Sequence, residues 1–234
     1  MGERRQAVLF DFFGTLVHYQ PDRRELTYAV SHSRAVDLGY RGDHAAFVVD
    51  WDDASAELEA ATATDHAEFS MTDAAHAFGR RAGLAFTDDD ARELGSLFVT
   101  EWQRDVHPVA DLAMFIEGLY DRYRLGIVSN THDPAMVPTL LTEYGIVDRF
   151  DAIVLSVDHG FRKPHASIYR RALDAIRLPA SEVTFVGDTL EPDYLAPRHA
   201  GMSAYLIGAP NTVVPEHRRL DSVLDLAERL GRGD

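Results

Sequence analysis

The sequence holds one lysine and three acidic residues placed where chemistry could occur. Lys163 is the only lysine, and the other 22 basic residues are arginine, which indicates that a compact ammonium is needed at this position. Asp11 follows the apolar run AVLF, Asp188 follows VTFVG, and Asp193 comes five residues later. Carboxylates that converge make an oxygen-rich site for a hard cation such as Mg²⁺. Without a metal such a cluster would be strongly self-repelling.

The apolar runs before these residues predict buried parallel strands. They are apolar without alternation, as strands covered on both faces are. Similar runs alternate with helical patterns further along the chain, which favours an α/β fold with a doubly wound, Rossmann-like parallel sheet. Open sheets of this kind place their ligands at the carboxyl ends of the strands, where Asp11 and Asp188 stand. Further strands are expected at residues 125–128, 153–155, 183–186 and 204–207.

The segment between the first two predicted strands reads as helical throughout. No strand pattern occurs after Leu16 until Arg124. Thr72 and Thr87 precede helical runs and are expected to act as N-caps. Helices are expected at residues 22–38, 43–61, 72–82 and 88–104, with another at 112–119.

The order of these patterns predicts two domains. Gly39 and Gly83 suit the ends of the helices before them, because glycine readily adopts the left-handed conformation found there. At 234 residues the chain has room for one substantial domain with an inserted module. We expect residues 1–17 and 106–234 to form the α/β core and residues 18–105 to form an inserted helical domain.

Four short motifs stand in order at the predicted strand ends. They are DFFGTL at residues 11–16, SNT at 129–131, GFRKPHASIY at 160–169 and GDTLEPD at 187–193. The set resembles the motifs of the haloacid dehalogenase (HAD) superfamily, of which the first is Asp-x-Asp-x-Thr followed by an apolar residue. The helical insert looks like the C1-type cap of its subfamily I. Such caps close over the nucleophile and exclude water.

The resemblance implies roles for most of these residues. In the family the first aspartate, here Asp11, is the nucleophile, and the lysine, here Lys163, pairs with it and with the substrate anion. Ser129 and Asn130 can donate hydrogen bonds to the same anion. The implied ligands of Mg²⁺ are Asp11, the backbone carbonyl of Phe13, Asp188 and Asp193.

Phe13 departs from the family pattern, and this departure leaves the reaction open. Phosphatases of the family carry an aspartate at this position as general acid/base, whose loss typically costs ~10²–10⁴-fold in rate. The L-2-haloacid dehalogenases of the family carry a tyrosine there and use no metal, because halide leaves without protonation. They lack the acidic pair that this chain retains as Asp188 and Asp193. The chain is dehalogenase-like in its first motif and phosphatase-like in its fourth.

Five residues are candidate substrate contacts. Phe13, Thr15 and Thr131 belong to the motifs themselves. Arg23 could reach an anionic group of the substrate, and His18 could carry a proton in place of the missing aspartate. A helix-surface arginine and an ordinary linker histidine are the alternatives for these last two.

Composition and charge restrict the partners. The net charge is −15, and residues 41–105 contain fifteen acidic residues against five arginines. Such a surface repels phosphate backbones, so nucleic acid is not an expected partner. The acidic stretch can be a solvated helical face or can bind a cationic partner.

There is no cysteine, which excludes disulfides and thiolate metal sites. No apolar stretch approaches the ~20 residues of a membrane span, and no signal peptide is evident, so a cytoplasmic location is expected.

The leading hypothesis is a Mg²⁺-dependent HAD-like hydrolase that uses Asp11 on a small anionic, phosphorylated metabolite. One alternative is haloacid dehalogenase-type displacement at carbon, or displacement or ring closure with phosphate or sulfate as leaving group in a biosynthetic pathway. Another is a non-catalytic binding protein of the same fold, against which the retention of Lys163, Asp188 and Asp193 argues. The sequence predicts a monomer or homodimer, leaves a protein partner open, and does not choose the substrate.

Overall fold

The computed structural model describes residues 6–19, 28–208 and 212–231. The chain forms two compact units, of which the first comprises Met1–His18 with Pro108–Asp234 and the second comprises Tyr19–His107. Each unit has a hydrophobic core of its own. Whether the second unit serves as a cap stays a prediction.

The first unit is built on a six-stranded sheet in the order β5-β4-β1-β6-β7-β8. All the strand pairs in this sheet are parallel, so the predicted α/β class is confirmed. The chain runs outward from the central β1 in both directions, which is the strand order of a doubly wound sheet. The strands are β1 (Ala7–Phe10), β4 (Arg124–Ser129), β5 (Ala152–Leu155), β6 (Val183–Gly187), β7 (Ser203–Ile207) and β8 (Arg219–Leu220).

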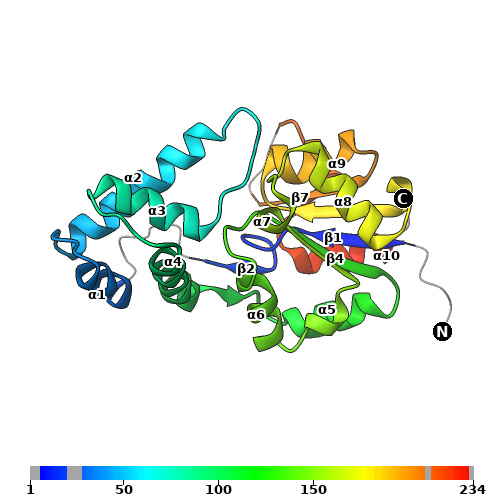
Figure 1. Cartoon of the computed structure of the whole chain (residues 1–234). Helices are drawn as coiled ribbons and strands as arrows, with labels where there is room; N and C mark the ends of the chain where they lie inside the picture. The colour runs from blue at the N-terminus through cyan, green and yellow to red at the C-terminus, as the bar shows by residue number, and fades with distance from the viewer. Residues whose placement is uncertain (1–5, 20–27, 209–211, 232–234) are drawn as a thin grey trace. The chain divides into compact units, whose positions relative to one another are not determined.

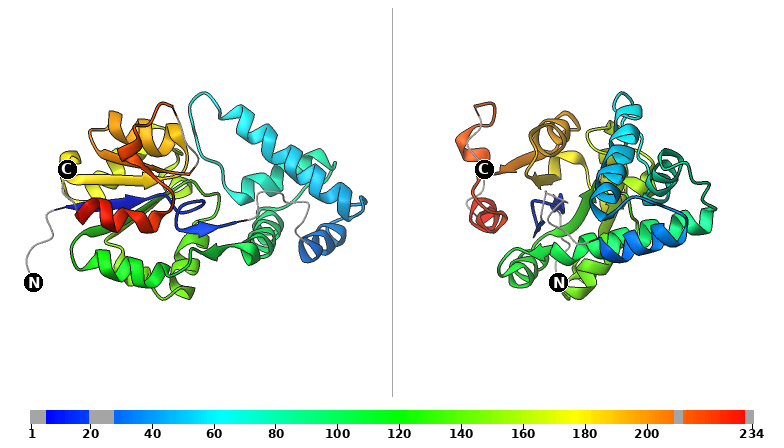
Figure 2. Two further views of the ribbon diagram at one scale, coloured as in Figure 1. Left: turned by 180° about the vertical axis from the view of Figure 1, so that it is seen from behind. Right: turned by 90° about the vertical axis from the view of Figure 1, so that its left-hand side faces the viewer.

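Helices cover both faces of this sheet. Figures 1 and 2 show α8 and α9 on one face and α5 with α10 on the other. In α8 the buried side chains Ile168, Tyr169, Ala172 and Ile176 follow the helical repeat and face the sheet. The helices are α5 (Leu112–Tyr120), α6 (Met136–Glu143), α7 (Ser156–His159), α8 (Ala166–Ile176), α9 (Ala196–His199) and α10 (Leu226–Gly231).

Three short strands were not predicted. β2 (Val17–His18) and β3 (His107–Pro108) form a separate two-stranded sheet, so the expectation that no strand occurs between Leu16 and Arg124 is wrong. β8 adds a last strand at the edge of the main sheet. Each of the three is only two residues long, and two residues cannot show the alternation by which strands are recognised.

The second unit is helical, as predicted for this part of the chain. Its helices are α1 (Ala29–Asp37), α2 (His44–Ala61), α3 (Met71–Arg81) and α4 (Asp88–Trp102). Thr87 caps α4 as predicted, with Asp90 completing a capping box. The prediction of Thr72 as a cap is wrong, because Ser70 caps α3 and pairs with Asp73 in the same way. Both Ser70 and Thr72 precede the apolar face, and only the acidic residue three positions on singles out Ser70.

Aromatic rings and one buried carboxylate hold the second unit together. The ring of Phe98 stacks between Tyr28 and Trp51, with ring centroids 4.2 Å apart on each side. Glu101 is buried and accepts hydrogen bonds from the backbone N–H groups of Val30 and Ser31, at 3.0 and 2.8 Å. Because these N–H groups have no partner within α1, the carboxylate of α4 completes the first turn of that helix.

Candidate active site

The carboxyl ends of three neighbouring strands carry the polar residues of the first unit. Asp11 directly follows β1, and its backbone N–H donates to the carbonyl of Val186 in β6 at 2.9 Å. β4 lies on the other side of β1 and ends in Ser129. Asp188 directly follows β6. The residues therefore meet at the point where the strand order reverses in a doubly wound sheet, the usual place for a ligand.

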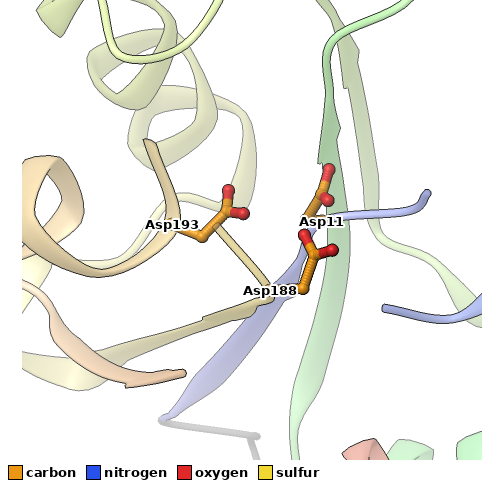
Figure 3. Close-up of side chains that lie close together, drawn as sticks. All are labelled: Asp11, Asp188 and Asp193. Atoms are coloured by element: carbon orange, nitrogen blue, oxygen red, sulfur yellow. The ribbon is translucent and has the colours of Figure 1, made fainter. Parts of the chain in front are cut away.

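Three carboxylates gather at this point. Asp11, Asp188 and Asp193 each offer an oxygen, and these oxygens all lie within 4.8 Å of one another. Figure 3 shows the three side chains converging, with Asp193 approaching from the segment after β6. Asp11 is 7% and Asp193 1% exposed, whereas Asp188 faces solvent. Carboxylates that are buried this close together require positive charge between them.

Lys163 supplies part of that charge. Its Nζ donates to Oδ1 of Asp11 at 2.8 Å and to Oδ1 of Asp193 at 2.7 Å. The lysine is 4% exposed. Burial alone would lower its pKa, but the charges of Asp11 and Asp193 outweigh burial and raise the pKa above its usual value. The ammonium therefore stays charged and balances one carboxylate, which leaves the ionised cluster negative and suited to a cation.

Burial shifts the pKa of the carboxyls as well. It raises the pKa of Asp11 to about 7, because desolvation and the charges of Asp193 and Asp188 outweigh the opposing attraction of Lys163. Asp188 is exposed as a residue, but its carboxyl group is partly desolvated inside the cluster, and this desolvation together with the charge of Asp193 raises its pKa. Without a counter-ion, Asp11 is therefore partly protonated near neutral pH, and a bound cation would displace that proton.

We predict a specific pH dependence for metal-free protein. The pKa of Asp11 is about 7 when folded against an ordinary value of 3.8, so between these values the folded state binds more protons than the unfolded state. Stability contributed by this group therefore falls as the pH rises from about 4 to about 7. Asp11→Asn removes the effect, so the variant should gain stability relative to wild type across this range. Urea unfolding in EDTA at several pH values measures the difference, and a constant difference would contradict the prediction.

Two glycines make the close approach of these carboxylates possible. Gly14 has a φ of +81°, and a Cβ at this position would overlap the carboxylate of Asp188. A Cβ on Gly187 would lie 2.5 Å from Cγ of Asp193. Any side chain at either position would displace an acidic group, so both glycines help to shape the site.

Two residues that sequence reasoning missed orient the acidic side chains. Thr189 donates from its backbone N–H to Oδ2 of Asp193 at 3.0 Å and from its hydroxyl to Oδ1 of Asp188 at 3.2 Å. Tyr169 of α8 donates its hydroxyl to the carbonyl of Pro192, in the π-helical turn Leu190–Leu195 that carries Asp193. Thr189 could have been noticed by its place beside Asp188, but no local pattern signals Tyr169.

The second motif contributes a buried hydroxyl and a bridge to Lys163. Ser129 is fully buried, and its hydroxyl lies 3.4 Å from the carbonyl of Asn130. The side-chain amide of Asn130 donates to the carbonyl of Lys163 at 3.1 Å and accepts from its backbone N–H at 2.8 Å. Asn130 thus fixes the backbone that presents the lysine, and its predicted contact with an anion stays a prediction.

Three other predicted substrate contacts, Thr15, Phe13 and Thr131, differ in how far they are buried and in what their side chains contact. Thr15 is buried with a hydroxyl that has no hydrogen-bond partner among the described residues. Phe13 is partly buried, and its ring packs edge-on against Phe12 at 5.0 Å between centroids. Thr131 is buried and uses its hydroxyl within its own turn, donating to the carbonyl of Asp133.

His18, the predicted proton carrier, is not part of the acidic cluster. His18 lies exposed in β2, where its backbone belongs to the two-stranded sheet with β3, and its side chain forms no hydrogen bond with another described residue. Arg23 lies outside the described residues. For both, a role in substrate binding or proton transfer stays a prediction.

Comparisons with known proteins agree with this arrangement. A family model described as haloacid dehalogenase-like hydrolase matches residues 6–201. The ribulose-1,5-bisphosphate 5-phosphatase of Halopiger xanaduensis is 27% identical over 207 residues, which cover 86% of this chain and 83% of that protein. Two solved structures share the fold. They are a 2-haloacid dehalogenase from Pseudomonas syringae (TM-score 0.73, 20% identity, 98% and 99% of the two chains) and a HAD phosphatase from Thermococcus onnurineus (TM-score 0.64, 22% identity, 97% and 98%).

No helix among residues 6–19, 28–208 and 212–231 is long and apolar enough to cross a membrane.

Proposed function

The chain belongs to the haloacid dehalogenase-like hydrolases, and from this membership we propose that it hydrolyses a small phosphorylated metabolite with the help of Mg²⁺. The observation that carries the proposal is the cluster of Asp11, Asp188 and Asp193 around Lys163. The name of the Halopiger relative, a sugar-bisphosphate phosphatase, supports the substrate class.

The donor set fits a hard divalent cation. All three groups are carboxylates, and two glycines leave room for them where a Cβ would intrude. Asp11, Asp188 and Asp193 would hold the ion together with the backbone carbonyl of Phe13. When bound, the ion would neutralise charge on the substrate phosphate and help to orient it.

The protein's own residues supply the rest of the reaction. Asp11 attacks phosphorus with one carboxylate oxygen, so that a bond forms to phosphorus and the bond to the leaving oxygen breaks. Lys163 favours the ionised form of this carboxylate, against the effect of burial, and attracts the substrate anion. Ser129 and the buried hydroxyl of Thr15 are available as donors to phosphate oxygens. Water then hydrolyses the aspartyl phosphate.

Phe13 limits which substrates this site can process. An apolar ring stands where a general acid would protonate the leaving oxygen, and no proton can come from it. The proposal therefore extends to substrates with a good leaving group or with a proton donor of their own. We propose that the helical unit Tyr19–His107 acts as the cap that selects among them.

The same ring favours a second candidate function, which is displacement at carbon with a leaving group that needs no proton. This class includes halide release from 2-haloacids and ring closure with loss of phosphate or sulfate. A substrate screen with and without Mg²⁺, spanning phosphate esters, acyl phosphates and 2-haloacids, tests both candidates. Halide release that ignores Mg²⁺, without turnover of any phosphate, would overturn the proposed function. Binding without any turnover would favour the non-catalytic alternative.

We expect Mg²⁺ to raise the melting temperature through Asp188. Binding to the folded state alone stabilises it by about 2.7 kcal/mol when the ion is present at about 100 times its Kd. Asp188→Asn should abolish this shift, because it removes a charged ligand. Asp188 is exposed, so its replacement should leave the fold intact.

Differential scanning fluorimetry with and without EDTA measures the effect. Asp174→Asn, at an exposed position of α8, is the matched control and should keep the full shift. A shift of equal size in wild type and Asp188→Asn would place the metal elsewhere.

Phe13→Asp should increase the hydrolysis of a generic aryl phosphate. If the missing acid/base limits this reaction, the variant should gain up to the ~10²–10⁴-fold that such a group contributes. The new carboxylate enters a partly buried position and bears a desolvation cost, so Phe13→Asn is the control of similar size without an acid. Steady-state kinetics at saturating Mg²⁺ compares the three proteins. Equal rates, with the metal bound, would show that another residue controls proton transfer.

A further inference from the structure

A pocket of the first unit gathers three basic side chains, and none of the three clustered aspartates lines it. Its volume is about 290 Å³, and no residue assigned above to the metal, the nucleophile or the substrate lines it. Arg198 reaches it from α9, while His217 and Arg218 reach it from the turn Glu216–Arg218. None of the residues that line it is acidic, on a chain whose net charge is −15. Such a pocket attracts anions.

Both arginines are held in place by neighbouring aromatic rings and hydroxyls. Cζ of Arg198 lies 5.1 Å from the centre of the Tyr194 ring, and its Nη1 donates to the Tyr194 hydroxyl at 3.0 Å. Arg218 lies over Tyr205 at the same distance, and its Nη1 donates to Oγ of Ser203 at 2.8 Å. Stacking fixes the plane of a guanidinium and so reduces the entropy lost when it binds a ligand.

Arg198 has donors to spare. A guanidinium carries five N–H groups, and the one hydrogen bond to Tyr194 leaves most of them available. Among the residues that the structure describes, no carboxylate forms an ion pair with Arg198. An arginine that is oriented but not neutralised is a ready partner for an anionic ligand.

We propose that this pocket is a second anion site, which binds a small tetrahedral dianion such as inorganic phosphate. The planar forks of two arginines match the oxygens of a phosphate group, and the nearby His217 adds a further donor. The volume of about 290 Å³ lies just below the ~300–1,000 Å³ of small-molecule pockets, which favours a ligand of this size over a nucleotide. The site needs no metal, unlike the acidic cluster.

Calorimetric titration of metal-free protein with inorganic phosphate in EDTA tests the proposal. Under this condition the acidic cluster repels the anion, so the heat reports the arginine pocket. Arg198→Gln/Arg218→Gln should raise the Kd at least about tenfold, because it removes two charge-assisted contacts. The control Arg92→Gln/Arg170→Gln changes the net charge equally at two exposed positions and should bind like wild type.

Crystals soaked in tungstate, a heavy-atom analogue of phosphate, would locate the bound anion directly. The anomalous peak of tungsten should lie between Arg198 and Arg218. If the double variant does not fold, the Kd of the single variant Arg198→Gln tests the proposal. This variant should fold, because the side chain of Arg198 is exposed and makes one hydrogen bond. A Kd that is unchanged in the pocket variant, an equal loss in the control pair, or no binding to wild type would each overturn the proposal.

Discussion

Asp11→Asn should lower turnover by at least about 10⁴-fold, the order of loss seen when a covalent nucleophile is removed. An amide is nearly isosteric with a carboxylate but is not a nucleophile at neutral pH. The fold should persist, because burial disfavours the charged form of the Asp11 carboxyl, whose pKa is raised to about 7, and the neutral amide does not bear that cost. Activity, the melting temperature and the mass of the intact protein should be measured together, so that deamidation back to aspartate is detected.

Asp174→Asn is the matched control, because it makes the same change at an exposed position of α8. It should keep full activity. Fluoride salts of beryllium or aluminium, which imitate a phosphoryl group on a carboxylate, should bind to wild type and not to Asp11→Asn. An Asp11→Asn protein that is free of aspartate and still active would show that another residue is the nucleophile.

Lys163→Met should destabilise the metal-free protein by about 3–5 kcal/mol, as expected when one partner of a buried ion pair is removed. Methionine fills a similar volume but leaves Asp11 and Asp193 facing each other without a positive charge between them. Both accept hydrogen bonds from Nζ, at 2.8 and 2.7 Å. The loss should be greater at pH 8 than at pH 5, because protonation of the carboxyls relieves the repulsion.

Urea unfolding in EDTA measures this loss, and Arg170→Met is the control at an exposed position of α8. Mg²⁺ should restore part of the lost stability, since it supplies positive charge at the same carboxylates. Lys163→Arg should fold better than Lys163→Met and still be severely impaired in turnover, because a planar guanidinium does not fit a compact site. Equal stability of Lys163→Met and wild type would show that the ion pairs contribute no net stability.

Much of the core could be predicted because its signals are local. The apolar runs of β1, β4, β5, β6 and β7 are each four to six residues long, which is enough to mark a buried strand. Asp11 and Asp188 could be placed at strand ends because they directly follow such runs. The fold class and the family could therefore be predicted from sequence alone.

The details of the site could not be predicted from the sequence, because they depend on contacts between distant segments. Lys163 was expected beside Asp11, but its equal contact with Asp193 depends on how α8 and the turn after β6 pack together. The need for glycine at Gly187 is set by the position of Asp193 in space, six residues further on. Asn130 and Lys163 are 33 residues apart, and no pattern in either segment signals that they bind each other.

The two hydrogen bonds between Asn130 and the backbone of Lys163 determine when the entropy of ordering this segment is lost. These bonds hold the backbone that carries the ammonium in place before a substrate arrives. Its loss of conformational freedom therefore occurs once, when the chain folds, and not again in every catalytic cycle. In such a site the dipoles and charges do not have to reorganise as the reaction proceeds, so the binding energy of the substrate can be used on the reacting group instead.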